Sequence, residues 1–387
     1  MLIISLIAFI ILPILSIILL IIGATYSKKY RMIYMIGIAF VLAIIAYKYI
    51  PTFEYDLYRH HLEMDKLRLM NFSRVLKYAI SEVEILRIMI MYIISKFNNN
   101  NILQFIIAFC GYTIIFFMIT DYAKRKNIKR WVVLLCSIYL VFTLNYIYFI
   151  SGLWNYIAMI IFALGVYIEY ILKKTKWYLY ALYLITPFIH ISMLFVIVLK
   201  VLCKIIAKDR VNLKSFIIIS IMMIGIPIFI SIISKYSSIP ILSYLVRMYQ
   251  SYFINGSKYD YLHRGNKVIV AIIDFIIYLY AFYCVRKKAN EPIYNIAIIF
   301  FVSTLILMIS SSVFIRFIFL AQLIGLPILM NYLNNVKLNK TDSIISFGIM
   351  LYILVLIMQR INYIKSFNYG NLFDNGMTSN IVTIFKN

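Results

Sequence analysis

Apolar segments long enough to cross a bilayer recur along this sequence from residue 1 to about residue 360. A spanning helix needs about 20 mostly apolar residues, and in lipid a helix is the one open-ended structure that satisfies its own backbone polar groups. Apolar residues make up 64% of the chain and charged residues 13%, whereas soluble domains have about 45–50% and about 25%. The sequence therefore predicts an all-α, polytopic integral membrane helical bundle, with residues 1–387 in a single transmembrane domain.

We predict about ten spanning helices, supplemented by partial or re-entrant ones. The predicted spans are 1–23, 32–50, 102–120, 131–150, 154–172, 213–233, 267–285, 292–310, 313–333 and 343–360. Residues 81–97 are apolar but begin with two glutamates and an arginine, which predicts an interfacial or partly inserted helix. Residues 1–23 lack a basic leading region and a small-residue cleavage site, so we expect them to remain as the first helix.

The basic residues gather in short clusters between the apolar segments, and these clusters account for most of the net charge of +24. Such clusters mark the cytoplasmic side of a membrane protein. All of them fall on one side if the N-terminus is outside. The outer side then receives the two longest loops, 51–80 and 234–266, and the C-terminal tail 361–387. Nucleic-acid binding is disfavoured, because it needs a contiguous basic face.

Residues 177–205 are apolar throughout but are interrupted by Pro187 and His190. Basic residues flank the segment on both sides, so both of its ends favour the cytoplasm. We therefore predict a broken pair of short re-entrant helices whose bend points outward. Broken helices at membrane depth occur where they are buried in protein or line a cavity.

Arg316 is the one clear ionisable side chain that we place inside a span on the predicted outer side. An ionisable residue at such a depth is costly and indicates a function. His190 has two interpretations: it hydrogen-bonds backbone groups freed by Pro187, or it takes part in chemistry. Arg59 and Arg74 are likewise either solvated loop charges or part of a binding surface.

No motif indicates a metal, a cofactor or a nucleotide. His60 and His61 are adjacent, but no third ligand follows them at helical spacing. The four cysteines show no Cys-x-x-Cys pair, and the sequence contains no Walker motif and no Gly-x-Ser-x-Gly. We therefore expect a membrane-borne substrate that approaches from outside. Arginines and aromatic rings on the outer side suit a lipid-linked sugar.

Four short segments, in their order along the chain, resemble the polysaccharide polymerases of the Wzy and EpsG type, which build bacterial O-antigen, capsule or exopolysaccharide. These segments are Tyr55-Asp56-Leu57-Tyr58, Ser151-Gly152-Leu153-x-Asn155 followed by Ala158, His190-Ile191-Ser192, and Arg316-Phe317. The resemblance covers most of the chain, and the order and spacing carry it more than any one segment does.

One residue departs from the pattern of the family. Trp154 stands where family members commonly have an arginine. If that arginine binds pyrophosphate, its charge is replaced here by Arg59, Arg74, Arg247 or Arg264, or else Trp154 serves as a platform for a sugar ring.

The resemblance implies a GT-C-like membrane glycosyltransferase in the bacterial cytoplasmic membrane, working without a cofactor. It implies that the growing chain, carried on undecaprenyl diphosphate, is transferred to a hydroxyl of the incoming lipid-linked repeat unit. The lipid bilayer and the undecaprenyl-diphosphate-linked oligosaccharide are then its partners, and a chain-length regulator protein is a candidate partner.

The implied reaction makes two chemical demands on the residues. The leaving diphosphate needs positive charge and the attacking hydroxyl needs a base. We expect Arg316 and Arg247 to bind the diphosphate, with Arg264 in reserve. His190 is the candidate base, and Asp56 is its rival. The other candidates for contact with the substrate are Tyr58, Asn155 and Tyr249.

Two other functions stay open on the sequence. The first is another transferase that uses the same lipid donor, such as an O-antigen ligase, which typically has one large external domain. The second is a flippase or exporter, which is expected to show repeats and charges deep in several spans. In this sequence the residues predicted to lie outside the membrane are divided between two loops, which disfavours the ligase. We place one clear charged residue deep inside a span, which disfavours the flippase. Both features favour the polymerase.

Overall fold

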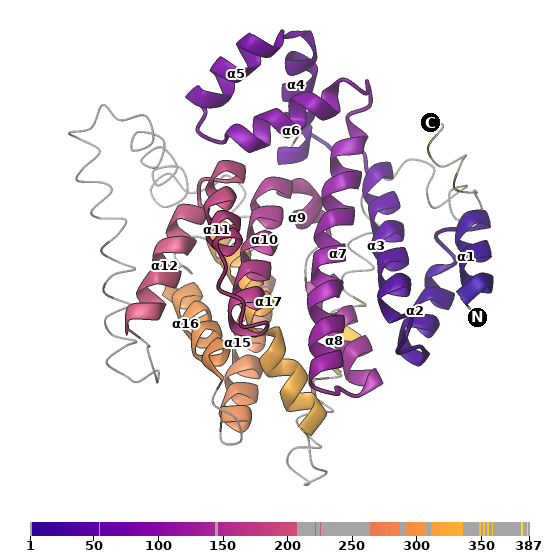
Figure 1. The fold of residues 1–387 in the computed structure, drawn as a ribbon, viewed down its shortest axis with the longest axis vertical. Coiled ribbons are helices and arrows are strands. Elements are labelled where there is room, and N and C mark those ends of the chain that lie inside the picture. Colours follow the sequence, from indigo (N-terminus) through magenta and orange to yellow (C-terminus); the bar gives the residue numbers. More distant parts are fainter. Residues whose placement is uncertain are drawn as a thin grey trace. The chain divides into compact units, whose positions relative to one another are not determined.

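The computed structural model describes residues 2–53, 55–143, 146–206, 264–286, 291–306 and 311–335, with single residues elsewhere. Every regular element in these ranges is an α-helix (Figure 1), which confirms the all-α prediction. The helices are α1 (Leu2–Ile11), α2 (Ile17–Tyr26), α3 (Arg31–Lys48), α4 (Asp56–Leu69), α5 (Phe72–Ser81), α6 (Ile85–Ser95), α7 (Asn101–Arg125), α8 (Arg130–Thr143), α9 (Tyr146–Ser151), α10 (Leu153–Tyr170), α11 (Trp177–Ile189), α12 (Met193–Ile206), α15 (Arg264–Arg286), α16 (Pro292–Ile306) and α17 (Ser311–Asn335).

The chain forms two compact units. Unit 1 consists of Met1–Leu76, Leu86–Ile160 and Leu333–Asn387, and unit 2 consists of Lys77–Ile85 and Ile161–Tyr332. Each unit is assembled from segments that are distant in the sequence, so no single cut of the chain separates the two.

Four of the described helices are long and apolar enough to cross a membrane, namely α3, α7, α10 and the Arg316–Asn335 part of α17. They coincide with four of the spans predicted from the sequence, and shorter apolar helices accompany them. The predicted spans 213–233 and 343–360 lie mostly outside the described residues.

The prediction of one unbroken helix over residues 1–23 is wrong, because the structure has α1 and α2 there. Pro13 lies between the two helices. Its ring removes a backbone N–H donor and clashes with the preceding turn, so a helix breaks at this position. The hydroxyl of Ser16 donates to the carbonyl of Pro13 at 2.6 Å, which supplies a partner to a backbone group beside the break.

Within unit 1, α3 lies between α2 and α7 (Figure 1). A Cβ atom at Gly23 would collide with the ring of Tyr34, so the absence of a side chain lets α2 and α3 approach closely. On the other side of α3, the ring of Phe40 packs edge-on against Phe105 and Phe109, with centroids 5.2 and 5.7 Å away. These contacts hold α3 firmly against α7.

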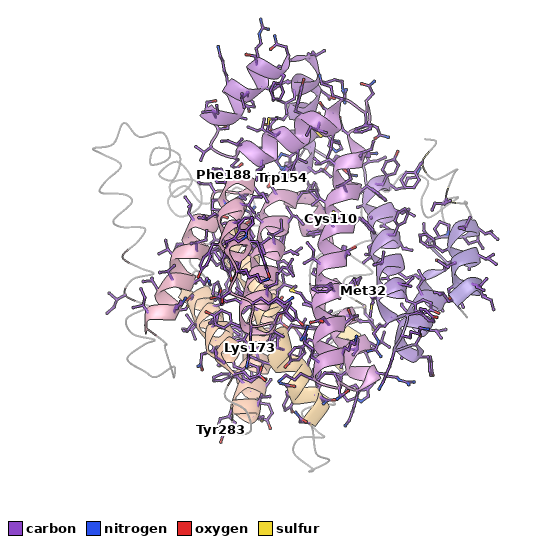
Figure 2. All side chains as sticks on the ribbon, viewed as in Figure 1. Met32, Cys110, Trp154, Lys173, Phe188 and Tyr283 are labelled. Carbon is purple, nitrogen blue, oxygen red and sulfur yellow. The ribbon has the colours of Figure 1, made fainter. Side chains whose placement is uncertain are left out.

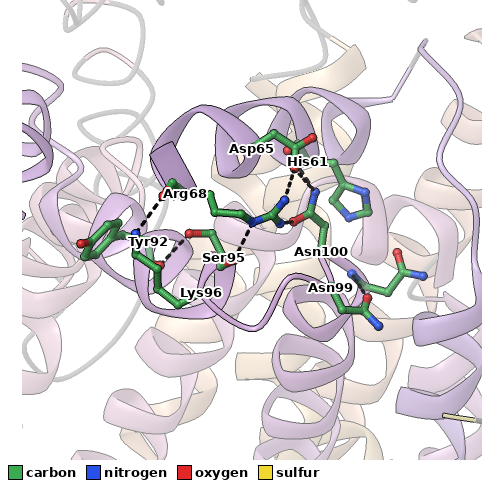
Figure 3. Close-up of polar contacts among 9 residues, drawn as sticks. His61, Asp65, Arg68, Tyr92, Ser95, Lys96, Asn99 and Asn100 are labelled. Atoms are coloured by element: carbon green, nitrogen blue, oxygen red, sulfur yellow. Dashed lines mark hydrogen bonds and ion pairs between the residues drawn. The ribbon is translucent and has the colours of Figure 1, made fainter. Parts of the chain in front are cut away.

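The predicted outward loop 51–80 is largely helical, because it contains α4 and nearly all of α5. In unit 1, α4 and α6 lie beyond the N-terminal end of α7 (Figure 1). Arg68 fastens α4 there: its guanidinium donates to Oδ1 of Asn100 at 2.6 Å, to Asp65 at 3.0 Å and to the carbonyl of Ser95 at 2.8 Å (Figure 3). The ammonium of Lys96 donates back to the carbonyl of Arg68 at 2.9 Å. Together these bonds attach the C-terminal end of α4 to the corner between α6 and α7.

Within unit 2, α15, α16 and α17 pack through aromatic rings. The rings of Tyr278 and Phe301 have centroids 4.5 Å apart. A Cβ atom at Gly325 would press against both rings, so glycine allows α17 to lie close to them. Close van der Waals contact of this kind, between aromatic rings and a glycine, is typical of helices that pack together in lipid.

The chain breaks between α11 and α12, inside the segment where the sequence predicts a broken pair. α11 has 13 residues and α12 has 14, so each helix rises only about 20 Å. A bilayer core is about 30 Å thick, so each helix by itself is too short to cross it completely. The re-entrant course of the pair stays a prediction.

Candidate functional site

The residues that the sequence singled out divide between the two units. Unit 1 holds Asp56, Tyr58, Arg59, Arg74, Trp154 and Asn155. Unit 2 holds His190, Arg264 and Arg316, and both Arg247 and Tyr249 lie outside the described residues. Each group is therefore described within its own unit.

Asp56 and Arg59 open α4. Asp56 is the first residue of the helix, where a negative charge interacts favourably with the helix dipole. Its carboxylate pairs with the guanidinium of Arg59 one turn later, and that guanidinium is 66% exposed. Tyr58 and Arg74 are exposed as well. These side chains form a solvated surface on α4 and α5.

A more enclosed polar centre lies about one turn further along α4. Nη1 of Arg87, from α6, donates to Oε2 of Glu63 at 2.9 Å, and the two side chains are only 12% and 18% exposed. The same carboxylate oxygen lies 3.8 Å from Nδ1 of His60, just beyond hydrogen-bond distance. The ring of His60 stands edge-on to Trp154, with centroids 6.4 Å apart and planes at 85°. Trp154 lies at the start of α10 and is labelled in Figure 2. We call His60, Glu63, Arg87 and Trp154 the His60 centre.

The surroundings of His60 keep its imidazole neutral. Burial lowers the pKa of His60 below its ordinary value, and the charges of Arg87 and Arg59 lower that pKa further, although Glu63 opposes them. Because Glu63 faces Nδ1, it favours the tautomer in which Nδ1 carries the proton. Nε2 then holds a lone pair, which is the form of histidine that accepts a proton.

His61 has a different role, which its partners define. Nε2 of His61 lies 3.1 Å from Oε1 of Gln104 in α7. The amide nitrogen of Gln104 donates to the carbonyls of Ala46 at 2.6 Å and Tyr49 at 2.9 Å, so its oxygen is left to accept from His61. Burial lowers the pKa of His61 to about 4. Neutral His61 is therefore a donor that attaches α4 to α3 and α7.

Trp154 and Asn155 are buried, with 2% and 4% of their surfaces exposed. Protein atoms therefore cover both faces of the Trp154 ring, and a sugar has no access to them in this conformation. The indole N–H of Trp154 has no hydrogen-bond partner among the described residues. A buried donor left in this way costs about 1–3 kcal/mol, so Trp154 combines a packing role with an unused donor.

In unit 2, His190 lies at the break between α11 and α12. Its Nδ1 is 2.8 Å from the hydroxyl of Ser192. The carboxylate of Glu84, 4% exposed, accepts from the backbone N–H of Ile191 at 3.1 Å. Val83, next to Glu84, has φ of 66°, a conformation that is strained for a β-branched residue. The strained corner thus brings a buried carboxylate to the backbone of the break.

A second polar group in unit 2 connects α10, α11 and α12. The ammonium of Lys200 lies 2.6 Å from Oε2 of Glu169, and the side chains are 9% and 11% exposed. The hydroxyl of Tyr183 donates to the same carboxylate oxygen at 2.8 Å, and the Lys200 ammonium lies 3.9 Å from the Tyr183 ring centroid. These contacts fix both arms of the broken pair to α10.

Arg316 lies near the beginning of α17 and is partly buried. The next residue, Phe317, packs edge-on against Phe195 of α12 with centroids 5.4 Å apart. Further along α17, the amide of Gln322 donates to the buried carboxylate of Asp274 in α15 at 2.8 Å. Arg264 is the first residue of α15. Unit 2 therefore holds other enclosed ionisable groups besides the predicted Arg316, namely Asp274 and the Glu169–Lys200 pair.

The sequence analysis missed several residues of these centres. Glu63 was detectable, because it follows His60 at a helical spacing of three, so the expectation that no third ligand follows the two histidines at helical spacing was wrong. Arg87 and Gln104 gave no such signal, since their partners lie 24 and 43 positions away. In the part of the chain that the structure describes, no group of three or more His, Cys, Asp or Glu residues could hold a metal ion.

The apolar helices indicate a membrane protein, and each of its two units holds enclosed ionisable side chains. A family model, the EpsG family, matches residues 31–372. The chain therefore belongs to the EpsG family, which confirms the resemblance found in the sequence and indicates a polysaccharide polymerase. No curated protein and no solved structure shows a significant match to the chain.

Proposed function

We propose that this protein polymerises undecaprenyl-diphosphate-linked oligosaccharide repeat units on the outer face of the bacterial cytoplasmic membrane. The observation that carries the proposal is the family match over residues 31–372, which includes both the His60 centre and the Arg316 region. The apolar helices support a lipid-linked donor, because such a substrate reaches its enzyme from within the bilayer.

In the proposed reaction, a hydroxyl of the incoming repeat unit attacks the anomeric carbon of the growing chain. The lipid diphosphate is the leaving group, so negative charge builds up on it as the bond breaks. A guanidinium binds such an anion through two parallel hydrogen bonds. We assign this role to Arg316, which lies near the beginning of an apolar helix. Arg247 and Arg264 are further candidates for the same anion.

The test is the length of polysaccharide made by cells that carry Arg316→Ala in place of the natural protein. We expect long chains to disappear while single repeat units remain, with a normal amount of protein in the membrane. The matched control is Arg125→Ala. Arg125 pairs with Asp121 at the end of α7 and is 47% exposed, so its loss should leave the chain-length distribution unchanged.

Two outcomes would contradict the proposal. A normal ladder of chain lengths in Arg316→Ala would remove Arg316 from the reaction. A deletion strain that still makes long chains, but fails to attach them to their final acceptor, would indicate the ligase instead of the polymerase.

A further inference from the structure

The His60 centre holds three of the parts that a proton-accepting site needs. Its imidazole is enclosed but not sealed, because the side chain keeps 16% of its surface exposed. A carboxylate, Glu63, faces one ring nitrogen, and Arg87 binds that carboxylate at 2.9 Å. The ion pair with Arg87 keeps Glu63 in its charged form, so it can hold the imidazole in one tautomer.

Trp154 adds two features to this centre. Its ring stands edge-on to His60 at 6.4 Å and forms a wall that limits rotation of the imidazole. Its indole N–H is buried without a partner among the described residues. An oxygen atom of a bound substrate would satisfy this donor once the side chains that enclose Trp154 move aside, because the indole N–H is buried in this conformation. An unused buried donor next to a neutral histidine therefore indicates a place for a hydroxylated ligand.

The two bases expected from the sequence are engaged differently. The carboxylate of Asp56 is paired with the guanidinium of Arg59, which favours its charged form and makes it a weaker proton acceptor. Nδ1 of His190 is 2.8 Å from the hydroxyl of Ser192, so this ring nitrogen is already engaged. His60 combines a facing carboxylate, that of Glu63, with a neighbouring buried donor, the indole N–H of Trp154.

We propose that His60 is the catalytic base of glycosyl transfer, that Glu63 is its positioning residue, and that the indole N–H of Trp154 binds an oxygen of the acceptor sugar. This inference rests on the proposed function. It assigns the base to α4, within unit 1, instead of to the predicted His190 or Asp56.

The proposed step is balanced as follows. The acceptor hydroxyl gives its proton to Nε2 of His60 while its oxygen forms a bond to the anomeric carbon of the growing chain. The bond between that carbon and the diphosphate oxygen breaks, and the diphosphate leaves with the electron pair. The proton then passes from the imidazolium to the released diphosphate or to water, which restores the neutral base.

The experiment uses the full-length protein in liposomes with a synthetic polyprenyl-diphosphate-linked oligosaccharide. His60→Asn keeps a donor near the position of Nδ1, facing Glu63, but has no basic nitrogen. We expect kcat to fall about 100-fold to 10,000-fold, as for other lost general bases. The matched control is His61→Gln, which keeps a donor near the position of Nε2 and should retain the wild-type kcat at neutral pH.

The pH profile separates catalysis from structure. Charges on α4 and α6 set the pKa of His60: Glu63 raises it, and Arg59 and Arg87 lower it. In the wild type, kcat/KM should rise with pH through an inflection below about 6.5, and His60→Asn should lack this acid limb. Glu63→Gln should lower kcat and move the inflection to lower pH, because the carboxylate that raises the pKa is gone.

Two further variants guard against misfolding as an explanation. His60→Ala should regain activity when imidazole is added, which a merely structural defect would not do. Trp154→Phe keeps the ring and removes the donor, so KM should rise about fivefold to tenfold with little change in kcat.

The outcomes distinguish the two proposals. If the wild type makes no polymer from the supplied donor, the proposed function fails. If the wild type is active and His60→Asn keeps its rate and acid limb, the proposed function stands and His60 is not the base. Loss of the acid limb in a His190→Asn variant would likewise overturn the assignment.

Discussion

Replacing Gln104 by Leu tests how α4 is attached to the spanning helices. The amide of Gln104 makes three hydrogen bonds, to Ala46, Tyr49 and His61, and the residue is fully buried. The carbonyl of Ala46 keeps a bond from the backbone N–H of Tyr49 at 3.1 Å. The carbonyl of Tyr49 and Nε2 of His61 lose their bonds to Gln104. The loss of a hydrogen bond by a buried group costs about 1–3 kcal/mol for each group. The attachment of α4 should therefore weaken by about 2–6 kcal/mol.

Hydrogen exchange measured by mass spectrometry, on the protein in nanodiscs, reads this loss locally. At about 1.4 kcal/mol for each factor of ten, amides in residues 56–69 should exchange about 30-fold to about 20,000-fold faster in Gln104→Leu. Amides of α15 and α16 should keep their wild-type rates, since they belong to unit 2. The matched control is Ile106→Leu on the same helix, at a position that is 36% exposed.

An unchanged exchange rate in residues 56–69 of Gln104→Leu would refute the reasoning. It would mean that the Arg68 contacts alone hold α4, and that the bond between His61 and Gln104 contributes little. Equal acceleration in both units would also contradict it, because the defect would then be global.

Two remaining predictions concern pH and backbone strain. The pKa of His61 is about 4 in the folded protein, below the ordinary value of about 6.5. Between these two pH values the unfolded chain therefore binds a proton that the folded protein does not. The contribution of His61 to the free energy of unfolding is full above pH 6.5 and falls as the pH drops, by up to about 3 kcal/mol below pH 4. His61→Gln should remove this acid sensitivity in a pH series of thermal unfolding, and an unaltered series would contradict the assignment. Val83→Gly should raise the free energy of unfolding by about 1 kcal/mol, because glycine adopts φ of 66° without strain; a lower melting temperature would show that the Val83 side chain contributes more by packing than its backbone costs.

The apolar pattern predicted the helical framework well, because length and hydropathy alone decide which segments can cross a bilayer. The helices α3, α7 and α10 each begin within a few residues of a predicted span. The break near His190 was also predictable, since a proline and basic flanks both argue against one straight span. Pro13 carried the same information for the first segment, where it was overlooked.

The polar helix α4 could not be predicted in the same way. Its 14 residues are mostly polar or charged, and such a composition outside a span resembles a loop. Its position depends on hydrogen bonds that Arg68 and His61 donate to Asn100 and Gln104, which lie 32 and 43 positions further along the chain. No local pattern encodes such contacts, so the attachment of His61 emerged only from the structure.

The measurement that tests the central claim most directly is polymerisation by the purified protein in liposomes. The substrate is a synthetic polyprenyl-diphosphate-linked repeat unit, and the readout is product length by gel electrophoresis together with released lipid diphosphate. The account predicts a ladder of products, with one lipid diphosphate released for each unit added. Unextended substrate in the presence of folded protein, or movement of the substrate across the membrane without any new glycosidic bond, would contradict it.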